Sequence, residues 1–193
     1  MRVYRSLIIA ACLGALLSAC GTGESNVAAG NKTGFLHYGN GAEPQGLDPH
    51  VVTGVPESHI VRALFEGLAV KNPITLESEP GVAERWAISE DGRVYTFYIN
   101  PEAKWSNGER MTASDYVWSW NRALHPDTGS LYAYMLYPIV NSEAYSKREI
   151  TDFGKVGVKA LDDLTLQVTL NEPTPGLRSS GMWQSSGISQ PKY

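Results

Sequence analysis

The stretch from residue 81 to residue 122 constrains the fold of this chain more than any other. It contains two strong turn dipeptides, Asp91-Gly92 and Asn107-Gly108. Between them, residues 94–99 alternate in a way that predicts a β-strand, with Tyr95, Phe97 and Ile99 on one face. Local signals that agree in this way indicate a specified fold and not a loose linker.

A capped helix is predicted directly after the second turn. Thr112 is placed to accept a backbone N–H bond, and Asp115 occupies the position of its capping-box partner. The dipeptide His125-Pro126 is expected to end the helix. One face of this helix is apolar and comprises Ala113, Tyr116, Val117, Trp120 and Leu124.

Four of the five tryptophans lie in this stretch: Trp86, Trp105, Trp118 and Trp120. Such a cluster could stack on a sugar, but three of them share strand or helix faces with other apolar residues. Core packing is therefore the favoured role, and Trp118 is the one that falls off the main helix face.

The remaining patterns add strands and helices in an α+β order. A short strand is predicted over residues 35–38, a loop over 45–55, and a strand over 86–88 that pairs across the Asp91-Gly92 turn. A helix over 56–65 should begin at Pro56 and present Ile60, Val61, Leu64 and Phe65 on one side. Partly helical segments are expected at 131–137 and 141–147, and a hairpin at 155–160 and 164–170.

Composition excludes several classes of function. The chain has 193 residues and a formal net charge of −4, with no basic tract, so nucleic acid is not an expected partner. The motifs H-E-x-x-H and G-x-S-x-G and the phosphate-binding loop are absent. The four histidines, His37, His50, His59 and His125, have no metal-ligand spacing and favour local hydrogen-bonding roles. We therefore expect no enzyme, no metal and no cofactor, and a lipoprotein hydrolase remains the enzymatic alternative.

The first 34 residues predict export. Residues 1–19 have the organisation of a signal peptide, with Arg2 and Arg5 before an apolar run that is short for a membrane span. The motif Leu17-Ser18-Ala19-Cys20 resembles the bacterial lipoprotein signal, which implies cleavage before Cys20 and lipidation of its thiol. An ordinary secretory signal with a chance cysteine is the alternative. Residues 20–34, rich in Gly, Ser, Asn and Ala, predict a flexible tether.

A series of ordered motifs resembles one known family. They include Gly46-Leu47-Asp48-Pro49-His50, Leu64-Phe65-Glu66-Gly67-Leu68 and Thr112-Ala113-Ser114-Asp115 with Arg122. Val158 to Asp163 and Asn171-Glu172-Pro173 follow in the same order. Between Leu36 and about Pro175 the chain is therefore similar to bacterial extracellular solute-binding proteins of family 5, in the oligopeptide or murein-peptide branch.

The resemblance implies a periplasmic binding protein type II-like fold with two lobes around a hinge. Residues 35–65 would begin lobe one, and residues 66–175 would form an accessory subdomain. Residues 176–193 lack a helix or strand period and are expected to be a tail outside the family pattern. We therefore expect a chain truncated to the first part of lobe one plus the accessory subdomain, from a shortened or frame-shifted gene.

The same resemblance implies the ligand and the partners. The Thr53-Gly54-Val55 loop would pair with the backbone of an extended oligopeptide, and Tyr132 would contact the peptide near its N-terminal part. A plain loop residue is the alternative for Thr53, and a buried core aromatic is the alternative for Tyr132. The expected partners are an ABC permease and its ATPase subunits, together with a membrane reached through lipidated Cys20 on the extracytoplasmic side. We expect a monomer. A non-binding remnant or a membrane-tethered interaction module is the other function that remains open.

Overall fold

The computed structural model describes residues 24–174. The chain divides into two compact units, residues 1–40 and residues 41–193. In the first unit, the described residues form one helix, α2 (Asn26–Thr33), which Ser25 caps at its start and Gly34 ends in the left-handed conformation. The segment predicted to be a flexible tether thus contains a capped helix.

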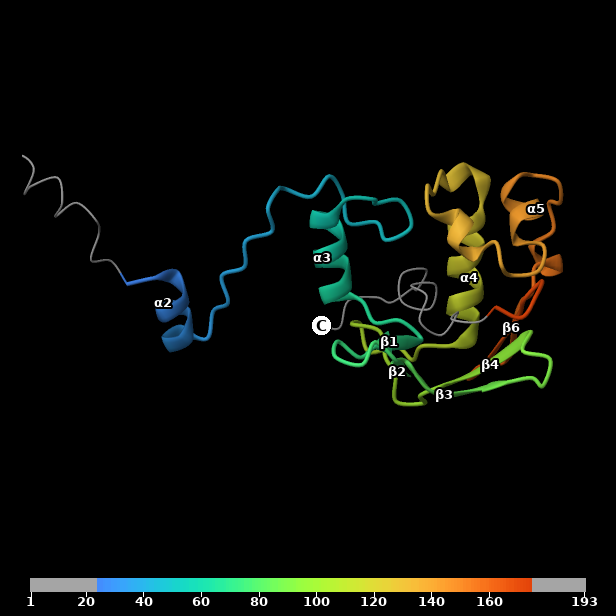
Figure 1. The fold of residues 1–193 in the computed structure, drawn as a ribbon, viewed down its shortest axis with the longest axis horizontal. Coiled ribbons are helices and arrows are strands. Elements are labelled where there is room, and N and C mark those ends of the chain that lie inside the picture. The colour runs from blue at the N-terminus through green and yellow to red at the C-terminus, as the bar shows by residue number, and fades with distance from the viewer. Residues whose placement is uncertain (1–23, 175–193) are drawn as a thin grey trace, which may run out of the picture. The chain divides into compact units, whose positions relative to one another are not determined.

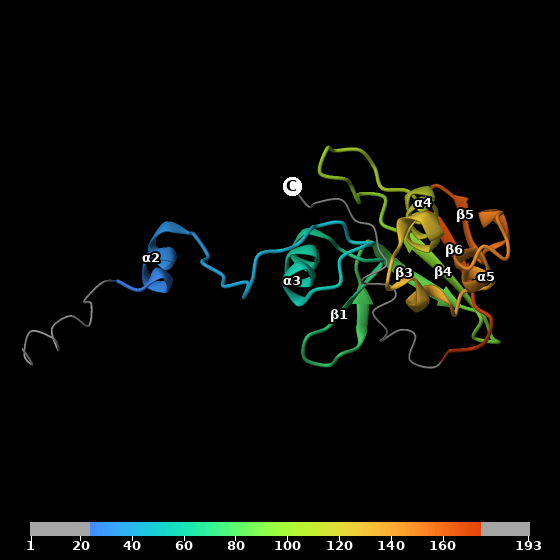
Figure 2. The same cartoon turned by 90° about the horizontal axis from the view of Figure 1, so that it is seen from above.

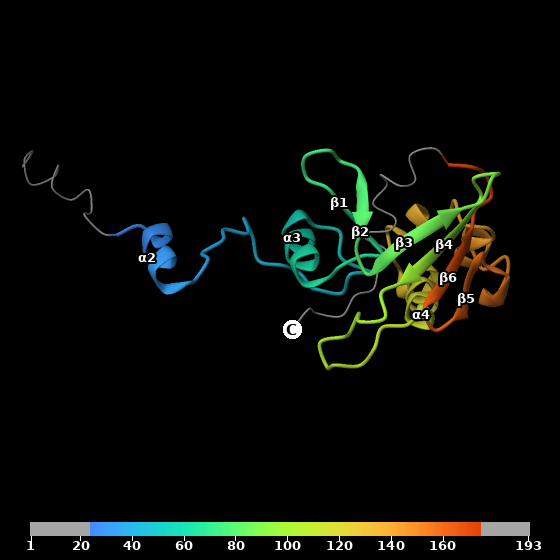
Figure 3. The same cartoon turned by 90° about the horizontal axis from the view of Figure 1, so that it is seen from below.

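The second unit contains a four-stranded antiparallel sheet in the order β3-β4-β6-β5. Its strands are β3 (Ala83–Ile88), β4 (Val94–Ile99), β5 (Val158–Asp162) and β6 (Thr165–Thr169). Figure 3 shows them side by side in that order. The two predicted hairpins are confirmed, because β3 pairs with β4 and β5 pairs with β6.

Two helices of the second unit lie on one face of this sheet (Figures 1 and 2). They are α4 (Ala113–Leu124) and α5 (Ser142–Ser146), with the 3₁₀ turns η1 (Pro126–Thr128), η2 (Ala133–Leu136) and η3 (Phe153–Lys155) around them. Helix α4 begins with the predicted capping box, in which the Asp115 carboxylate accepts from the Thr112 backbone N–H at 2.7 Å.

The main core lies between α4 and the sheet. Tyr95, Phe97 and Ile99 point into it from β4, as their alternation predicts, and Trp120 meets them from α4 with no exposed surface. Trp86 and Trp105 pack against the same cluster, whereas Trp118 is 63% exposed. The prediction that these tryptophans serve packing is confirmed for all but Trp118, the one expected to lie off the main face.

A smaller part of the same unit contains helix α3 (Val55–Leu64) and a two-stranded sheet of β1 (Ala69–Lys71) and β2 (Ser78–Pro80). Helix α3 lies within one residue of its predicted bounds. Glu57 is its only fully buried residue, and its predicted apolar face is only half-buried.

The strand predicted at residues 35–38 is wrong. This segment is irregular, and Phe35, Leu36 and Tyr38 are all exposed. The alternation of these residues has no effect without a partner strand, and no pairing involves them within residues 24–174.

Candidate functional site

A cavity of about 590 Å³ opens beside α3 in the second unit. One wall is the loop that runs through residues 49–55 into the first turn of α3. Other walls come from β1 and the turn before it, and from residues 130–136 around η2. A cavity of this size is in the range that accommodates small-molecule ligands or a short piece of extended polypeptide.

One face of α3 forms the long side of the cavity. Val55, Ser58 and Arg62 line it, at spacings that place side chains one above the other on a helix, and Phe65 lines the cavity just beyond the end of α3. The helix starts here because Gly54 leaves the helical conformation and Pro56 follows in the first turn, where its missing N–H is not needed.

The carboxylate of Glu57 anchors the loop of residues 45–55 to the start of α3. Its Oε1 accepts from the Gln45 backbone N–H at 2.7 Å, and that bond, together with its own backbone N–H, keeps the pKa of Glu57 below its usual value. A Cβ atom on Gly54 would lie 1.9 Å from Glu57 Oε2. Glycine at position 54 therefore leaves room for the carboxylate that anchors the loop.

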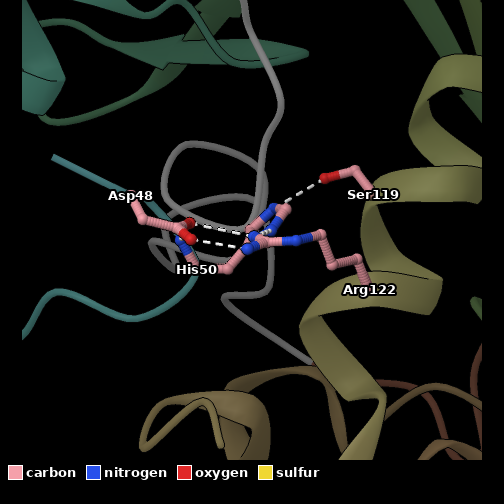
Figure 4. A network of polar contacts seen from close by, with 4 residues as sticks. All are labelled: Asp48, His50, Ser119 and Arg122. Carbon is pink, nitrogen blue, oxygen red and sulfur yellow. Dashed lines mark hydrogen bonds and ion pairs between the residues drawn. The ribbon is translucent and has the colours of Figure 1, made fainter. Parts of the chain in front are cut away.

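Four side chains tie the same loop to α4, and we call them the Arg122 network (Figure 4). Arg122 makes a two-pronged contact with Asp48, at 2.9 Å to Oδ1 and 2.5 Å to Oδ2. The Nη1 of Arg122 is also 2.6 Å from His50 Nδ1, and His50 Nε2 is 2.8 Å from Ser119 Oγ. Because His50 lines the cavity, the network fixes the position of one of its walls.

The arrangement of donors sets the protonation of His50. Arginine can only donate, so His50 Nδ1 accepts from Arg122 and the neutral ring carries its proton on Nε2, which donates to Ser119. Burial lowers the pKa of His50, and the nearby Arg122 charge lowers it further. The hydrogen bond from Arg122 lowers the pKa of Asp48. At neutral pH the network therefore contains one carboxylate, one guanidinium and a neutral imidazole.

The set of Asp48, His50 and Ser119 has the residue types of a hydrolase triad but not its geometry. Asp48 accepts from the backbone N–H of His50 and not from its ring. The ring nitrogen nearest Ser119 bears a proton, so it cannot remove one from the hydroxyl. Ser119 also has no exposed surface to offer a substrate. This cluster positions a loop and does not supply a nucleophile.

The four residues predicted to contact a ligand lie together. Thr53, Gly54, Val55 and Tyr132 all line the cavity, and the Tyr132 hydroxyl lies 3.4 Å from the Thr53 carbonyl oxygen, which is long for a hydrogen bond. Tyr132 is 46% exposed, so its alternative role as a buried core aromatic is wrong. The lipidation prediction for Cys20 falls outside the described residues.

The Arg122 network was not predicted from the sequence, although Asp48, His50 and Arg122 were noted as family landmarks.

Within residues 24–174 no group of three or more His, Cys, Asp or Glu side chains is arranged to hold a metal ion. Across the same residues, no helix has the length and apolar character needed to cross a membrane.

The comparison with family models gives one match. The model for bacterial extracellular solute-binding proteins, family 5 (middle region), matches residues 77–192, which is more than half of the chain. The chain belongs to this family. The match runs past Pro175, where the sequence analysis expects the family pattern to end.

Individual family 5 proteins extend this similarity toward the N-terminus. The chain is 44% identical over 178 residues to the periplasmic oligopeptide-binding protein OppA of Escherichia coli strain K12, a match covering 89% of the chain and 32% of that protein. It is 41% identical over 135 residues to the periplasmic murein peptide-binding protein MppA of the same strain, covering 69% of the chain and 25% of MppA. The chain thus spans about a third or less of the length of these relatives.

Solved structures agree with the fold. The crystal structure of Haemophilus influenzae OppA in complex with the peptide RPPGFSPFR matches with a TM-score of 0.68 and 38% identity, covering 72% of this chain and 27% of that one. The prediction of an α+β fold of the periplasmic binding protein kind is confirmed.

Proposed function

We propose that this chain contributes to the peptide-binding site of the substrate-binding component of an ABC importer. The observation that carries the proposal is the cavity itself. It brings the 53–55 loop and Tyr132 to one surface, although they lie far apart in the sequence and were selected by family resemblance alone. The similarity to OppA, an oligopeptide-binding protein, and to MppA, a murein peptide-binding protein, supports a peptide as the ligand.

Backbone pairing is the mode of recognition that we propose. The 53–55 loop is extended at Gly54, so its backbone groups can pair with an extended peptide as an added strand would. Main-chain bonds are indifferent to ligand sequence, and the hydroxyl groups of Ser58 and Tyr132 supply further polar contacts in the cavity. The Arg122 network and Glu57 would hold the loop in its binding conformation before the ligand arrives.

The domain assignment and the partners follow from the same proposal. Residues 35–65 would belong to lobe one and residues 66–175 to the accessory subdomain. Peptide bound between two lobes stabilises a closed form, which the permease recognises, while the ATPase subunits supply the energy. Lipidation of Cys20 would hold the protein, as a monomer, at the extracytoplasmic face of a membrane.

Isothermal titration with a mixture of tri- to pentapeptides tests the proposal. We expect saturable binding that Tyr132→Ala weakens, with Tyr134→Ala as the matched control, because Tyr134 is an exposed neighbouring tyrosine that does not line the cavity. Absence of saturable heat with every peptide would reject the proposal and favour the non-binding remnant or tethered module.

The membrane anchor has its own test. When the chain is expressed in a bacterium, the wild type should partition into the detergent phase, and Cys20→Ser should partition into the aqueous phase. Equal partitioning of the two variants would mean that Cys20 carries no lipid.

A further inference from the structure

Two cations line the cavity and take part in no ion pair among the described residues. Arg62 projects from the last turn of α3, and Lys71 is the final residue of β1. Neither makes a salt bridge to any other residue in the range 24–174. Both line one cavity in a chain whose net charge is −4.

The other ionisable residues of the cavity leave that charge in place. His50 is neutral, because burial and Arg122 lower its pKa. Among the lining residues within 24–174, Glu66 is the one acidic side chain. Glu66 already interacts with another group in the protein. Burial raises the pKa of the Tyr116 hydroxyl, and the nearby charge of Glu66 raises it further. The charges of the described lining residues, Arg62, Lys71 and Glu66, therefore sum to one net positive charge.

Arg62 is separated from the peptide-pairing loop by a defined interval along α3. Val55 begins α3 and Arg62 lies seven positions further along it, and a helix rises about 1.5 Å per residue, so the interval is about 10 Å. An extended peptide advances about 3.3 Å per residue. A peptide backbone paired with residues 53–55 would thus place a group about three residues away beside Arg62.

We propose that this cavity selects peptides that carry a carboxylate about three residues from the part paired with residues 53–55. The inference rests on the proposed peptide-binding function and adds a ligand class to it. A side-chain carboxylate of Asp or Glu and a C-terminal carboxylate are the two sources of this group, and both offer the same chemistry to Arg62 and Lys71.

The preference should be moderate, because Arg62 is exposed and Lys71 is half-buried. Ion pairs at exposed positions contribute little individually, and two of them together correspond to about a three- to tenfold change in affinity. The preference should shrink as ionic strength rises, since the Debye length falls from about 10 Å at 0.1 M salt to about 3 Å at 1 M.

A matched peptide series tests this. Tetra-alanine peptides with Glu, Gln or Lys scanned through each position, as free acids and as C-terminal amides, are titrated into the full chain at low and high salt. We expect Glu to bind about three- to tenfold more tightly than Lys at one position, with Gln between them. A preference for Glu over Gln in amidated peptides identifies a side-chain carboxylate as the source. A loss on amidation that is independent of Glu identifies the C-terminus.

Charge reversal provides the decisive variant. Lys71→Glu should reverse the order so that the Lys peptide binds more tightly than the Glu peptide. Lys71→Gln should flatten the preference. Lys159→Gln on β5 is the control, because Lys159 is exposed, does not line the cavity and changes the net charge by the same amount. Arg62 is a poorer target for a first variant, because it also stabilises the C-terminal end of α3.

The two proposals fail in distinguishable ways. Binding of no peptide, the Gln series included, rejects peptide binding itself. Binding of the Glu, Gln and Lys peptides with equal affinity, with no loss on amidation and no change in Lys71→Glu, overturns the carboxylate preference and leaves peptide binding standing.

Discussion

Removal of the Arg122 guanidinium should release the loop that forms one wall of the cavity. In Arg122→Met the aliphatic stem is kept and three polar contacts are lost, two to Asp48 and one to His50. The Asp48 carboxylate can turn to solvent, because its side chain is 40% exposed. His50 cannot, because it is 8% exposed, and its Nδ1 would remain buried without a donor.

The expected cost follows from those exposures. A solvent-screened ion pair contributes about 0–1 kcal/mol, so the Asp48 contact is placed in that range despite its good geometry. A buried acceptor without a partner costs about 1–3 kcal/mol. The free energy of unfolding should therefore fall by about 2 kcal/mol, which corresponds to roughly 4–8 °C in Tm for a domain of about 150 residues.

Two measurements together check this prediction. Urea unfolding monitored by tryptophan fluorescence gives the loss of stability. Amide hydrogen exchange then locates it. The Val51 and Val52 amides, which donate to the Asp48 carbonyl, should exchange faster in the variant, while the amides of β4 keep their protection relative to global unfolding.

Arg148→Met is the matched control. Arg148 also pairs with an aspartate, Asp127, but both side chains are about two-thirds exposed. This variant should lose no more than about 0.5 kcal/mol. Equal losses of stability in the two variants, or unchanged exchange at residues 51 and 52 in Arg122→Met, would refute the role assigned to Arg122.

Three further predictions concern pH, backbone approach and the tryptophans. The unfolded chain protonates His50 near pH 6.5 but the folded chain resists this, so the free energy of unfolding should fall as pH drops below about 6.5, and His50→Gln should lack that component. Asp48, whose pKa is lowered by folding, adds a second loss of stability below about pH 4, which Asp48→Asn should lack. Acid titrations of His50→Gln and Asp48→Asn that superimpose on the wild type would contradict both assignments. A Cβ on Gly81 would lie 2.4 Å from the Gly67 carbonyl oxygen, so Gly81→Ala should cost about 1–3 kcal/mol in urea unfolding, whereas Gly46→Ala, which meets only Val52 at 3.8 Å, should be neutral. Trp120→Ala should cost about 3–5 kcal/mol and Trp118→Ala less than about 0.5 kcal/mol, and equal losses would remove the packing role assigned to Trp120.

The parts of the fold that local sequence predicts are those that local contacts stabilise. Gly92 and Gly108 both adopt positive φ angles, 70° and 89°, in the turns predicted from their dipeptides. The capping box of α4 needs only residues three apart, and the alternation of β4 needs only a sheet with one buried face. Each of these signals is complete within a few residues.

The predictions of secondary structure that are wrong or missing concern segments whose stabilising contacts come from distant parts of the chain. Residues 35–38 have a strand-like alternation, yet a strand forms only when another strand accepts its hydrogen bonds. Conversely, β1 and β2 have three residues each and little periodicity, and they pair because the turn at 72–77 is closed by the Asn72 side chain, which accepts from the amides of Ile74 and Thr75.

The Arg122 network shows the same limit at the site. Ser119 and Arg122 are three residues apart on α4 and lie beside its predicted apolar face. The sequence of a helix does not show which of its polar sides another segment of the chain will cover. That side is covered because Asp48 and His50, two apart in a loop, present a carboxylate and an imidazole acceptor to one guanidinium. The conformation of residues 53–55 therefore depends in part on a pairing that joins positions more than seventy residues apart. The residues that would touch a ligand can be proposed from family resemblance, but what holds them in position is a property of the tertiary structure.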